Sequence, residues 1–289
     1  MIEESELIVN PDGTIFHLHL HPWQVADRVI LVGDPGRVKM ISGMFDSVEF
    51  TVSNREFVTS TGLYHGHRIT VISTGIGTDN IDIVMNELDA LVNIDLAKRE
   101  ILPEHRTLQV CRIGTSGGLQ RDIPVNSWII SRQSVGFDGM LAFYANRKEF
   151  CDLPFEESLK HFISWPSDFP SPYVVHASEL LLNKFNKEPF IQGVNISAPG
   201  FYGPQGRSLR LGLAIPGLNG LLEKFRFHGQ KITNYEMESS AIYGLSKMLG
   251  HEAITACLLI ANRQTKSANE DYHRQMEQMV QSVLEILIS

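Results

Sequence analysis

The chain has 289 residues, 43% of them hydrophobic and 20% charged, which suffices for one large α/β domain with a sizeable core. Its formal net charge of −8 excludes a broadly basic surface for nucleic acid, so any anion site must be local. Three scattered cysteines are too few for a disulfide framework, the acidic start does not resemble a signal peptide, and no apolar run has membrane-spanning length. We therefore expect a single-domain, soluble, cytoplasmic protein without nucleic-acid or membrane partners.

Residues 15–21 alternate apolar residues with His17, His19 and His21. In a β-strand this period of two would place the three imidazoles on one face, as in a metal site. Zinc sites usually add a cysteine or carboxylate at matching spacing, however, and none is adjacent. We expect a surface strand, or one histidine that reaches a ligand, and no metal.

A predicted buried strand at residues 28–32 leads directly into the glycine-rich segment 33–38. This order predicts a strand, a turn and a helix that begins near Arg37, which together offer backbone N–H groups and a guanidinium to a phosphate. The G-x-G-x-x-G fingerprint of dinucleotide-binding proteins is absent. Taken alone, the segment is equally compatible with an ordinary tight turn between a strand and a helix.

A second junction of this kind follows a predicted β-meander, whose strands we place at 49–52, 55–59 and 67–72. The last strand leads into the small-residue loop 73–78. Thr78 or Asp79 is the expected N-cap of the helix that follows. The apolar face of this helix comprises Ile81, Val84, Met85, Leu88, Leu91 and Val92.

The third junction is the most distinctive. Residues 108–111 form an apolar strand, Arg112 stands at its end, and Gly114 to Gly118 form a loop without bulky side chains. Open α/β sheets bind ligands at the carboxyl ends of their strands, and a loop of small residues can close its N–H groups and hydroxyls on an oxyanion. One such junction could be a turn with a solvated arginine, but three in one chain favour a binding site.

Residues 197–207 combine Phe201, Gln205 and Arg207 with turn residues. An aromatic face, an amide and a guanidinium suit a flat heterocycle with carbonyl and N–H edges. The alternative is a plain surface loop, which would normally be more charged and less aromatic.

A predicted helix that opens at residues 234–241 carries Glu236 and Glu238 on either side of Met237. Acidic residues in a first helical turn often only complement the helix dipole. The two glutamates could equally direct a carboxylate at sugar hydroxyls.

The other predicted elements frame these loops. We expect strands at 123–130, 190–196 and 253–261 and a helix at 178–187, whereas residues 140–175 show no clear period. A C-terminal helix should pack on the core through Met276, Met279, Val280, Val283, Leu284 and Leu287.

Together these segments resemble the nucleoside phosphorylase-I family, and within it the branch that acts on uridine, along nearly the whole chain. The motifs occur in the family's order: Phe16-His17-Leu18, Gly33-Asp34-Pro35-Gly36-Arg37, Arg55-Glu56-Phe57, Ser73-Thr74-Gly75-Ile76-Gly77, Arg112-Ile113-Gly114-Thr115-Ser116-Gly117, Phe201-Tyr202 with Gln205 and Arg207, Tyr235-Glu236-Met237-Glu238-Ser239, and Asn262-Arg263. The resemblance implies a three-layer α/β/α fold around a central mixed, partly barrel-like sheet. It also implies a homo-oligomer, hexameric or dimeric, with active sites shared across a dimer interface.

The resemblance further assigns residues to the substrates. The phosphate-binding residues would be Gly33, Arg37, Arg55, Arg112 and Thr115. The ribose-binding residues would be His17, Ser116, Glu236, Met237 and Glu238, with His17 and Arg55 supplied by the neighbouring subunit. The base-binding residues would be Gly117, Phe201, Gln205 and Arg207. The catalytic groups would be Arg37, Arg112, Arg207 and Glu238, with inorganic phosphate as co-substrate and neither cofactor nor metal.

The chemistry of phosphorolysis agrees with this set. The sugar becomes oxocarbenium-like while inorganic phosphate attacks opposite the base, so no side-chain nucleophile is needed. We therefore expect uridine and phosphate to give uracil and ribose 1-phosphate, a step of nucleoside salvage.

Three alternatives remain at this point. A purine nucleoside phosphorylase of the same family would carry an aspartate where Asn262-Arg263 stands. A nucleosidase that uses water would not need Arg37, Arg55 and Arg112 together, and a non-catalytic nucleoside-binding protein would gain nothing from a phosphate pocket under the sugar.

Overall fold

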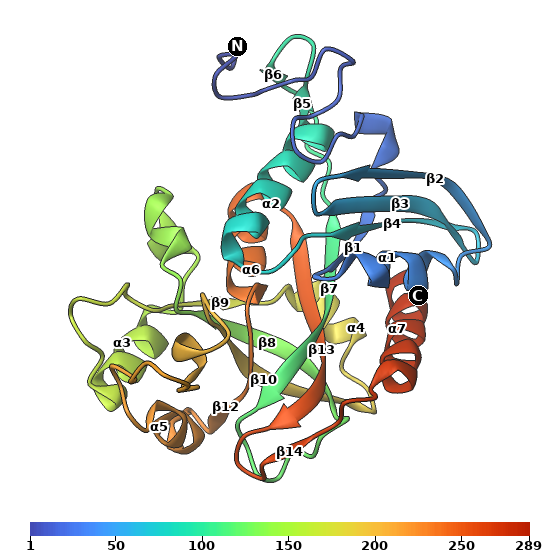
Figure 1. Cartoon of the computed structure of the whole chain (residues 1–289). Coiled ribbons are helices and arrows are strands. Elements are labelled where there is room, and N and C mark those ends of the chain that lie inside the picture. The colour runs from blue at the N-terminus through green and yellow to red at the C-terminus, as the bar shows by residue number, and fades with distance from the viewer.

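A computed structural model of the chain describes residues 1–289 and contains a 12-stranded mixed sheet with helices on its faces (Figure 1). The strand order is β11-β12-β10-β8-β13-β7-β1-β4-β3-β2, and β9 pairs with β8 while β14 pairs with β13. The strands of this sheet are β1 (Arg28–Val32), β2 (Ser47–Asn54), β3 (Phe57–Tyr64), β4 (His67–Ser73), β7 (Gln109–Gly118), β8 (Trp128–Gly136), β9 (Tyr173–His176), β10 (Phe190–Ser197), β11 (Arg226–Phe227), β12 (Gln230–Glu236), β13 (Glu252–Asn262) and β14 (Ser267–Ala268). A separate ladder joins β5 (Ile94–Asp95) to β6 (Glu100–Ile101).

The central strands run parallel and are buried on both faces. β1 pairs with β4 and β7, and β7 pairs with β13, each time in parallel. Val29 and Leu31 of β1 face one hydrophobic core, whereas Ile30 and Val32 face another. This two-sided burial explains the continuous apolar runs in the sequence. Because the strands are parallel, the loops at their carboxyl ends meet at one edge of the sheet.

At that edge the sheet closes on itself. β12 pairs in parallel with β10 and also antiparallel with β7, where Asn234 and Tyr235 lie opposite Gly118 and Gly117. Strands β7, β13, β8, β10 and β12 therefore form a ring, which confirms the predicted partly barrel-like sheet. The closure brings Glu236, the last residue of β12, to the glycine-rich end of β7.

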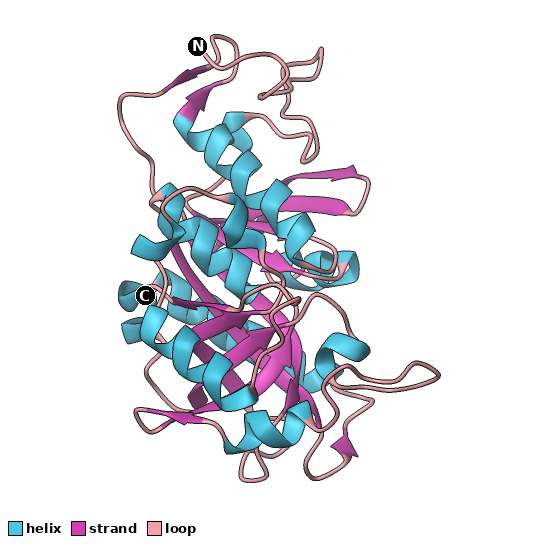
Figure 2. Ribbon diagram, turned by 90° about the vertical axis from the view of Figure 1, so that its left-hand side faces the viewer, coloured by secondary structure: helices cyan, strands magenta, loops and turns pink.

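Helices cover both faces of the sheet, and Figure 2 shows the strands running between them. One face is covered by α2 (Thr78–Asn93) and α6 (Ser239–Leu249), and the other by α1 (Pro35–Ser42), α4 (Glu179–Lys184) and α7 (His273–Ile288). A third cluster packs α3 (Leu153–Ile163) and α5 (Leu218–Lys224) on β10 and β12. The predicted core-facing residues of α7 are all buried. The layering confirms the predicted α/β/α class. No helix combines the length and apolar composition that crossing a bilayer requires.

The histidine-rich segment 15–21 does not form a strand. His19 has a left-handed backbone conformation with a φ of 55°, which interrupts the alternation of side chains. His17 instead pairs with Glu87, and His19 with Asp12. The prediction of a strand with a shared histidine face is therefore wrong.

The third predicted junction differs from the structure. Strand β7 continues through Gly118, so Gly114 to Gly118, predicted as a loop, are part of the strand, and Arg112 lies within the strand and not at its end. Pairing with β13 along this whole length overrides the local turn preference of the glycines.

Three further element boundaries differ from the predictions. Arg55 and Glu56, predicted within a strand, form the two-residue turn between β2 and β3, where Arg55 has a φ of 54°. Residues 234–236, predicted to open a helix, belong to β12, because pairing with two neighbouring strands overrides the local preference. Helix α2 begins at Thr78 and its N-cap is Gly77, so neither predicted N-cap is correct.

Candidate active site

Arg112 lies at the centre of the edge where these strands end. Its side chain is buried among acceptors: Nη2 donates to the Glu238 carboxylate, Nη1 lies 3.5 Å from Glu236 Oε2, and Nη1 also donates to Cys257 Sγ over 3.5 Å. Burial alone would lower the pKa of Arg112, but the carboxylates of Glu238 and Glu236 outweigh that effect and raise it. Arg112 is thus a fixed cation inside the protein.

Gly114 creates the space that Arg112 occupies. A Cβ at this position would lie 2.0 Å from Nη1 of Arg112. The guanidinium therefore packs directly against the strand backbone, in a space that any side chain larger than that of glycine would fill. The small residues in the second half of β7 therefore make room for the arginine as well as for any ligand.

A second guanidinium approaches from the first turn of α1. Asp34 caps this helix by accepting a hydrogen bond from the N–H of Gly36, and Arg37 Nη1 donates to the carbonyl oxygen of Ile113 over 3.2 Å. Burial, followed by the charge of Arg112, lowers the pKa of Arg37. Two partly desolvated guanidiniums that repel each other form a site suited to a multiply charged anion.

The neighbouring loops complete this edge. Gly33, at the end of β1, lies so close to the loop after β4 that a Cβ would be 3.4 Å from the carbonyl oxygen of Gly75. Thr115 and Ser116 follow Gly114 on β7, and the buried Ser116 hydroxyl has no hydrogen-bond partner in the protein. This edge therefore offers a closely packed glycine backbone and a free hydroxyl in addition to the two guanidiniums.

Glu238 stands between β12 and α6 and faces Arg112. Its Oε1 accepts a hydrogen bond from the backbone N–H of Gly77 over 2.8 Å, so the glycine at the start of α2 holds the carboxylate. Burial raises the pKa of Glu238, the charge of Arg112 opposes this shift, and Glu236 adds to it. Met237, half-buried, lies between the two glutamates in the chain.

The segment that the resemblance assigns to the base forms a second cluster. Gln205 Oε1 accepts hydrogen bonds from Arg207 Nη1 at 2.8 Å and from Arg263 Nη2 at 2.7 Å. The Arg207 guanidinium lies 3.6 Å from the centre of the Phe201 ring, and half of the Phe201 side chain remains exposed. An aromatic face, an amide and two cations are thus grouped as the sequence pattern predicted, with one arginine added.

Arg263 is the residue that sequence reasoning missed as a site residue. Its Nη1 also donates to the backbone carbonyl of Gln205 over 2.7 Å, and its guanidinium stacks 4.9 Å from the centre of the Tyr235 ring. Burial, together with the charge of Arg207, lowers the pKa of Arg263 to about 10. The available signal was its place directly after the most apolar strand, where polar residues reach the ligand edge.

Asn262, its neighbour, has a different role. Its amide donates to the carbonyl oxygens of Gln120 and Ile123, both over 2.8 Å, and its Oδ1 accepts from the N–H groups of Gln264 and Thr265. Asn262 therefore ties three chain segments together and has no amide hydrogen left for a ligand.

His17 and Arg55 lie apart from these clusters. His17 Nδ1 is 2.6 Å from Glu87 Oε1, and its carbonyl oxygen accepts from Asn54 at the hairpin where the exposed Arg55 sits. Arg55 lies 5.7 Å from the centre of the Phe16 ring. Within one chain, the two residues are neighbours of each other and make no contact with Arg112.

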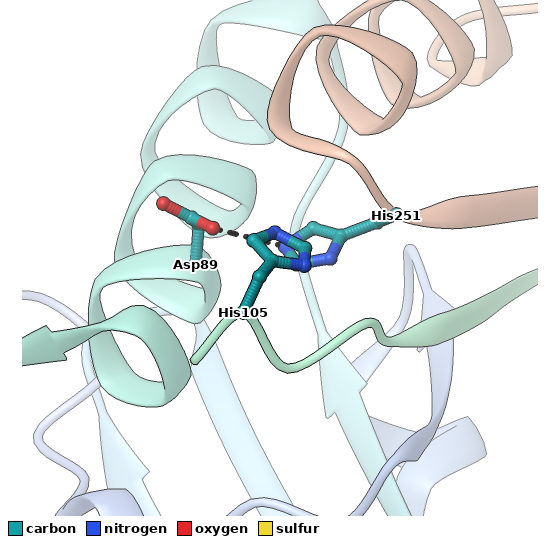
Figure 3. Close-up of side chains that lie close together, drawn as sticks. All are labelled: Asp89, His105 and His251. Carbon is teal, nitrogen blue, oxygen red and sulfur yellow. Dashed lines mark ion pairs between the residues drawn. The ribbon is translucent and has the colours of Figure 1, made fainter. Parts of the chain in front are cut away.

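A further cluster, Asp89 with His105 and His251, has ligand atoms within 4.8 Å of one another (Figure 3). The N–H of Leu108 donates to His251 Nδ1 over 3.2 Å, so the neutral ring carries its proton on Nε2, which lies 3.2 Å from Asp89 Oδ1. A metal at Nε2 would displace that proton and leave Nδ1–H facing another donor. We therefore interpret the cluster as a buried histidine–aspartate pair beside an exposed histidine, and assign it no metal.

Known proteins share this chain's sequence pattern. Residues 27–289 match the family model of the phosphorylase superfamily. Uridine phosphorylase of Haemophilus influenzae is 31% identical, over 93% of this chain and 95% of that protein. Uridine phosphorylase of Thermococcus kodakarensis is 28% identical, over 96% and 87%. A DeoD-type purine nucleoside phosphorylase of Streptococcus suis also matches at 24% identity, over 94% and 98%.

The fold is shared as well. The crystal structure of a Trypanosoma brucei nucleoside phosphorylase, reported to show uridine phosphorylase activity, aligns with a TM-score of 0.85 and 29% identity over 98% of this chain and 99% of that one. The family model covers the segments that supply Arg37, Arg112, Glu238 and Arg263, and so includes both side-chain clusters. By sequence and by fold, this chain belongs to the phosphorylase superfamily.

Proposed function

We propose that the chain is a pentosyltransferase that catalyses uridine + phosphate ⇌ uracil + ribose 1-phosphate. One observation carries the proposal: Arg112 binds Glu238 beside Arg37, so an anion site and a sugar-hydroxyl acceptor adjoin at one edge of the sheet. The cluster of Gln205, Arg207 and Arg263 supplies a site for the base. The uridine phosphorylases among the relatives support the same reaction.

Phosphate is the nucleophile in this proposal. Arg37 and Arg112 hold it, with Gly33 and Thr115 at its oxygens, beneath the anomeric carbon of the ribose. The bond to the base breaks as the sugar becomes oxocarbenium-like, and phosphate attacks from the opposite face. Holding both substrates in register supplies much of the rate enhancement. Inorganic phosphate is a co-substrate, and the proposed reaction needs no other cofactor.

The ribose lies against Ser116, Met237 and Glu238. The Glu238 carboxylate accepts hydrogen bonds from the 2′- and 3′-hydroxyls. It also keeps the Arg112 guanidinium in place, so the same carboxylate serves both substrates.

The base lies against Gly117, Phe201, Gln205 and Arg207. Gln205 pairs with the O2 and N3–H edge of uracil: its Nε2 donates to O2, and its Oε1 exchanges one of its two hydrogen bonds from Arg207 and Arg263 for the N3–H. Arg207, supported by Arg263, stabilises the negative charge that the departing base acquires. Each preorganised donor of this kind contributes on the order of 3 kcal/mol to transition-state stabilisation.

The active assembly is a homo-oligomer built from dimers, either a dimer or a hexamer. His17 and Arg55 belong to the neighbouring subunit's site, where His17 holds the ribose 5′-hydroxyl and Arg55 the phosphate. Their separation from Arg112 within one chain, and the exposure of Arg55, support this assignment. The three free cysteines are compatible with a reducing cytoplasm, where we place the enzyme.

The second candidate is a purine nucleoside phosphorylase, which the match to the DeoD-type protein brings into consideration. A departing purine needs a proton, and an acid at the end of β13 could deliver it. Asn262 occupies that position here, and both of its amide hydrogens are bound to carbonyl oxygens. We therefore favour a pyrimidine nucleoside over a purine nucleoside as the substrate.

The test measures uracil release from uridine with and without inorganic phosphate, and hypoxanthine release from inosine as the purine control. We expect release from uridine only, and only with phosphate. Release without phosphate would identify a nucleosidase, and turnover of inosine would overturn the assignment of Gln205 and Arg207 to uracil.

A further inference from the structure

Glu236 is surrounded by more donors than its carboxylate can serve. Its Oε1 accepts from Asn195 Nδ2 at 2.8 Å and from the Ser197 hydroxyl, and its Oε2 accepts from the N–H groups of Glu238 at 2.9 Å and Ser239 at 3.0 Å. Arg112 Nη1 adds a fifth donor group, 3.5 Å from Oε2. A carboxylate offers about four lone-pair sites, so none remains for a substrate hydroxyl.

Glu238 differs in this respect. Its two oxygens each accept one hydrogen bond from the protein, Oε1 from the N–H of Gly77 and Oε2 from Arg112. About two lone-pair sites therefore remain, which matches the two adjacent hydroxyls of a ribose. The two glutamates are separated by one residue and are nearly equally buried, but only one of them can accept from a sugar.

The donors around Glu236 come from three parts of the fold, and Glu236 itself belongs to a fourth. Asn195 and Ser197 are on β10, the N–H groups of Glu238 and Ser239 lie at the start of α6, Arg112 is on β7, and Glu236 itself ends β12. A fully satisfied buried network of this kind fixes the positions of its members. Here it fixes the backbone of Glu238 and one edge of the Arg112 guanidinium.

We propose that Glu236 is a positioning residue that sets the geometry of Arg112 and Glu238 without touching substrate, and that, of the two glutamates, only Glu238 receives the 2′- and 3′-hydroxyls of the sugar. The inference rests on the proposed phosphorolysis and changes the role that the family resemblance gives to Glu236. It assigns ribose recognition to one carboxylate and the alignment of phosphate with ribose to the other.

The test combines Glu236→Gln and Glu238→Gln with uridine, 2′-deoxyuridine and 3′-deoxyuridine. Glu236→Gln should lower kcat/KM by about 10- to 100-fold and by the same factor for all three nucleosides. The reason is that the new NH2 group replaces an acceptor oxygen and cannot accept hydrogen bonds from the N–H groups that surround it. In the matched Glu238→Gln variant, kcat/KM should fall less for the two deoxynucleosides than for uridine, because each of them lacks a hydroxyl that Glu238 would bind. A loss in Glu236→Gln that shrinks with either deoxynucleoside would mean direct contact with the sugar and would overturn the inference.

Phosphate binding, measured by calorimetry, separates positioning from charge. Removing a negative charge beside the anion site would by itself tighten phosphate binding, whereas a displaced Arg112 weakens it. We expect weaker binding by about tenfold in Glu236→Gln. Unchanged or tighter binding would contradict the positioning role.

Asn195→Ala provides a second variant in case Glu236→Gln does not fold. It leaves the charge of Glu236 intact and removes one of the donors that orient it. We expect a smaller loss of kcat/KM, again equal for the three nucleosides, and unchanged turnover would contradict the positioning role of Glu236. A wild-type enzyme that fails to release uracil with phosphate would overturn the proposed function itself, and the inference with it, whereas an active wild type isolates the role of Glu236.

Discussion

At the scale of single residues, the site depends on buried charged groups whose positions the surrounding protein fixes. Arg112 reaches its position because Gly114 carries no side chain, and it remains a cation because two carboxylates face it. Removing one partner from a buried ion pair leaves the other uncompensated, which costs far more than losing a surface pair. Substitutions in the two clusters should therefore have large and separable effects.

Arg207→Ala tests the base cluster alone. We expect kcat/KM for uridine to fall by about 100-fold, because one donor to the departing base is lost, while phosphate affinity stays within about twofold. Steady-state kinetics and phosphate calorimetry check the two halves of this statement. Arg210→Ala, on an exposed residue of the same loop, is the matched control and should behave as wild type. An equal loss of turnover and phosphate affinity in Arg207→Ala would contradict its assignment to the base.

The raised pKa of Glu238 predicts the acid side of the pH profile. Only the carboxylate can accept from both hydroxyls, so kcat/KM should fall as pH drops through a pKa above the ordinary glutamate value. A raised native pKa also means that this group's contribution to stability declines as pH rises through the same window. In Glu238→Gln, kcat/KM should no longer fall at low pH through this group, whereas any fall caused by protonation of phosphate itself should remain. An identical limb in the variant would assign the titration to another group.

At the scale of elements, the strand ends were predictable and their mutual arrangement was not. Apolar runs followed by glycines identified β1 and β4 with the loops after them, because buried parallel strands and small-residue turns leave that local signature. The same signal found the start of β7 but wrongly predicted a loop at Gly114 to Gly118, which the structure shows as strand. The pairing of Tyr235 with Gly117 joins residues far apart in the chain, and no local pattern encodes it. The same tertiary pairing turned the predicted helix start at 234–236 into a strand. The Arg55-Glu56 turn lacks the glycine that would have revealed it.

Gly114→Ala tests whether β7 shapes the anion site. The added Cβ would occupy the position of Arg112 Nη1, so we expect phosphate affinity to fall by about 100-fold, with little change in strand pairing. Phosphate calorimetry and thermal unfolding measure the two effects. Gly220→Ala, where a Cβ would meet no atom within 4 Å, is the control. Wild-type phosphate binding in Gly114→Ala would show that Arg112 does not need this space.

At the scale of the whole molecule, one chain groups the residues that we propose for phosphate, ribose and base, whereas its own His17 and Arg55 lie apart from Arg112. The Asn262-Arg263 motif contains Arg263, but the sequence pattern gave it no role, because its contact with Gln205 forms only in the folded chain. The shared site remains a prediction, since a contact between subunits produces no hydrophobic repeat or motif spacing that the sequence of one chain would reveal.

Subunit mixing tests the shared site. Arg55→Ala and Arg112→Ala should each be nearly inactive, but a hybrid dimer would contain one site with both arginines intact. Equal mixing under conditions that exchange subunits should restore about a quarter of wild-type activity, since half of the dimers are hybrids and half of their sites are whole. Hybrids that demonstrably form and stay inactive would place Arg55 in the site of its own chain.

In the proposed reaction, phosphate and not water attacks the sugar of a pyrimidine nucleoside. The most direct measurement is ³¹P NMR of the enzyme with uridine and inorganic phosphate, alongside quantification of uracil. We expect a ribose 1-phosphate resonance that grows in step with uracil. Uracil accompanied by free ribose, with the phosphate signal unchanged, would contradict it.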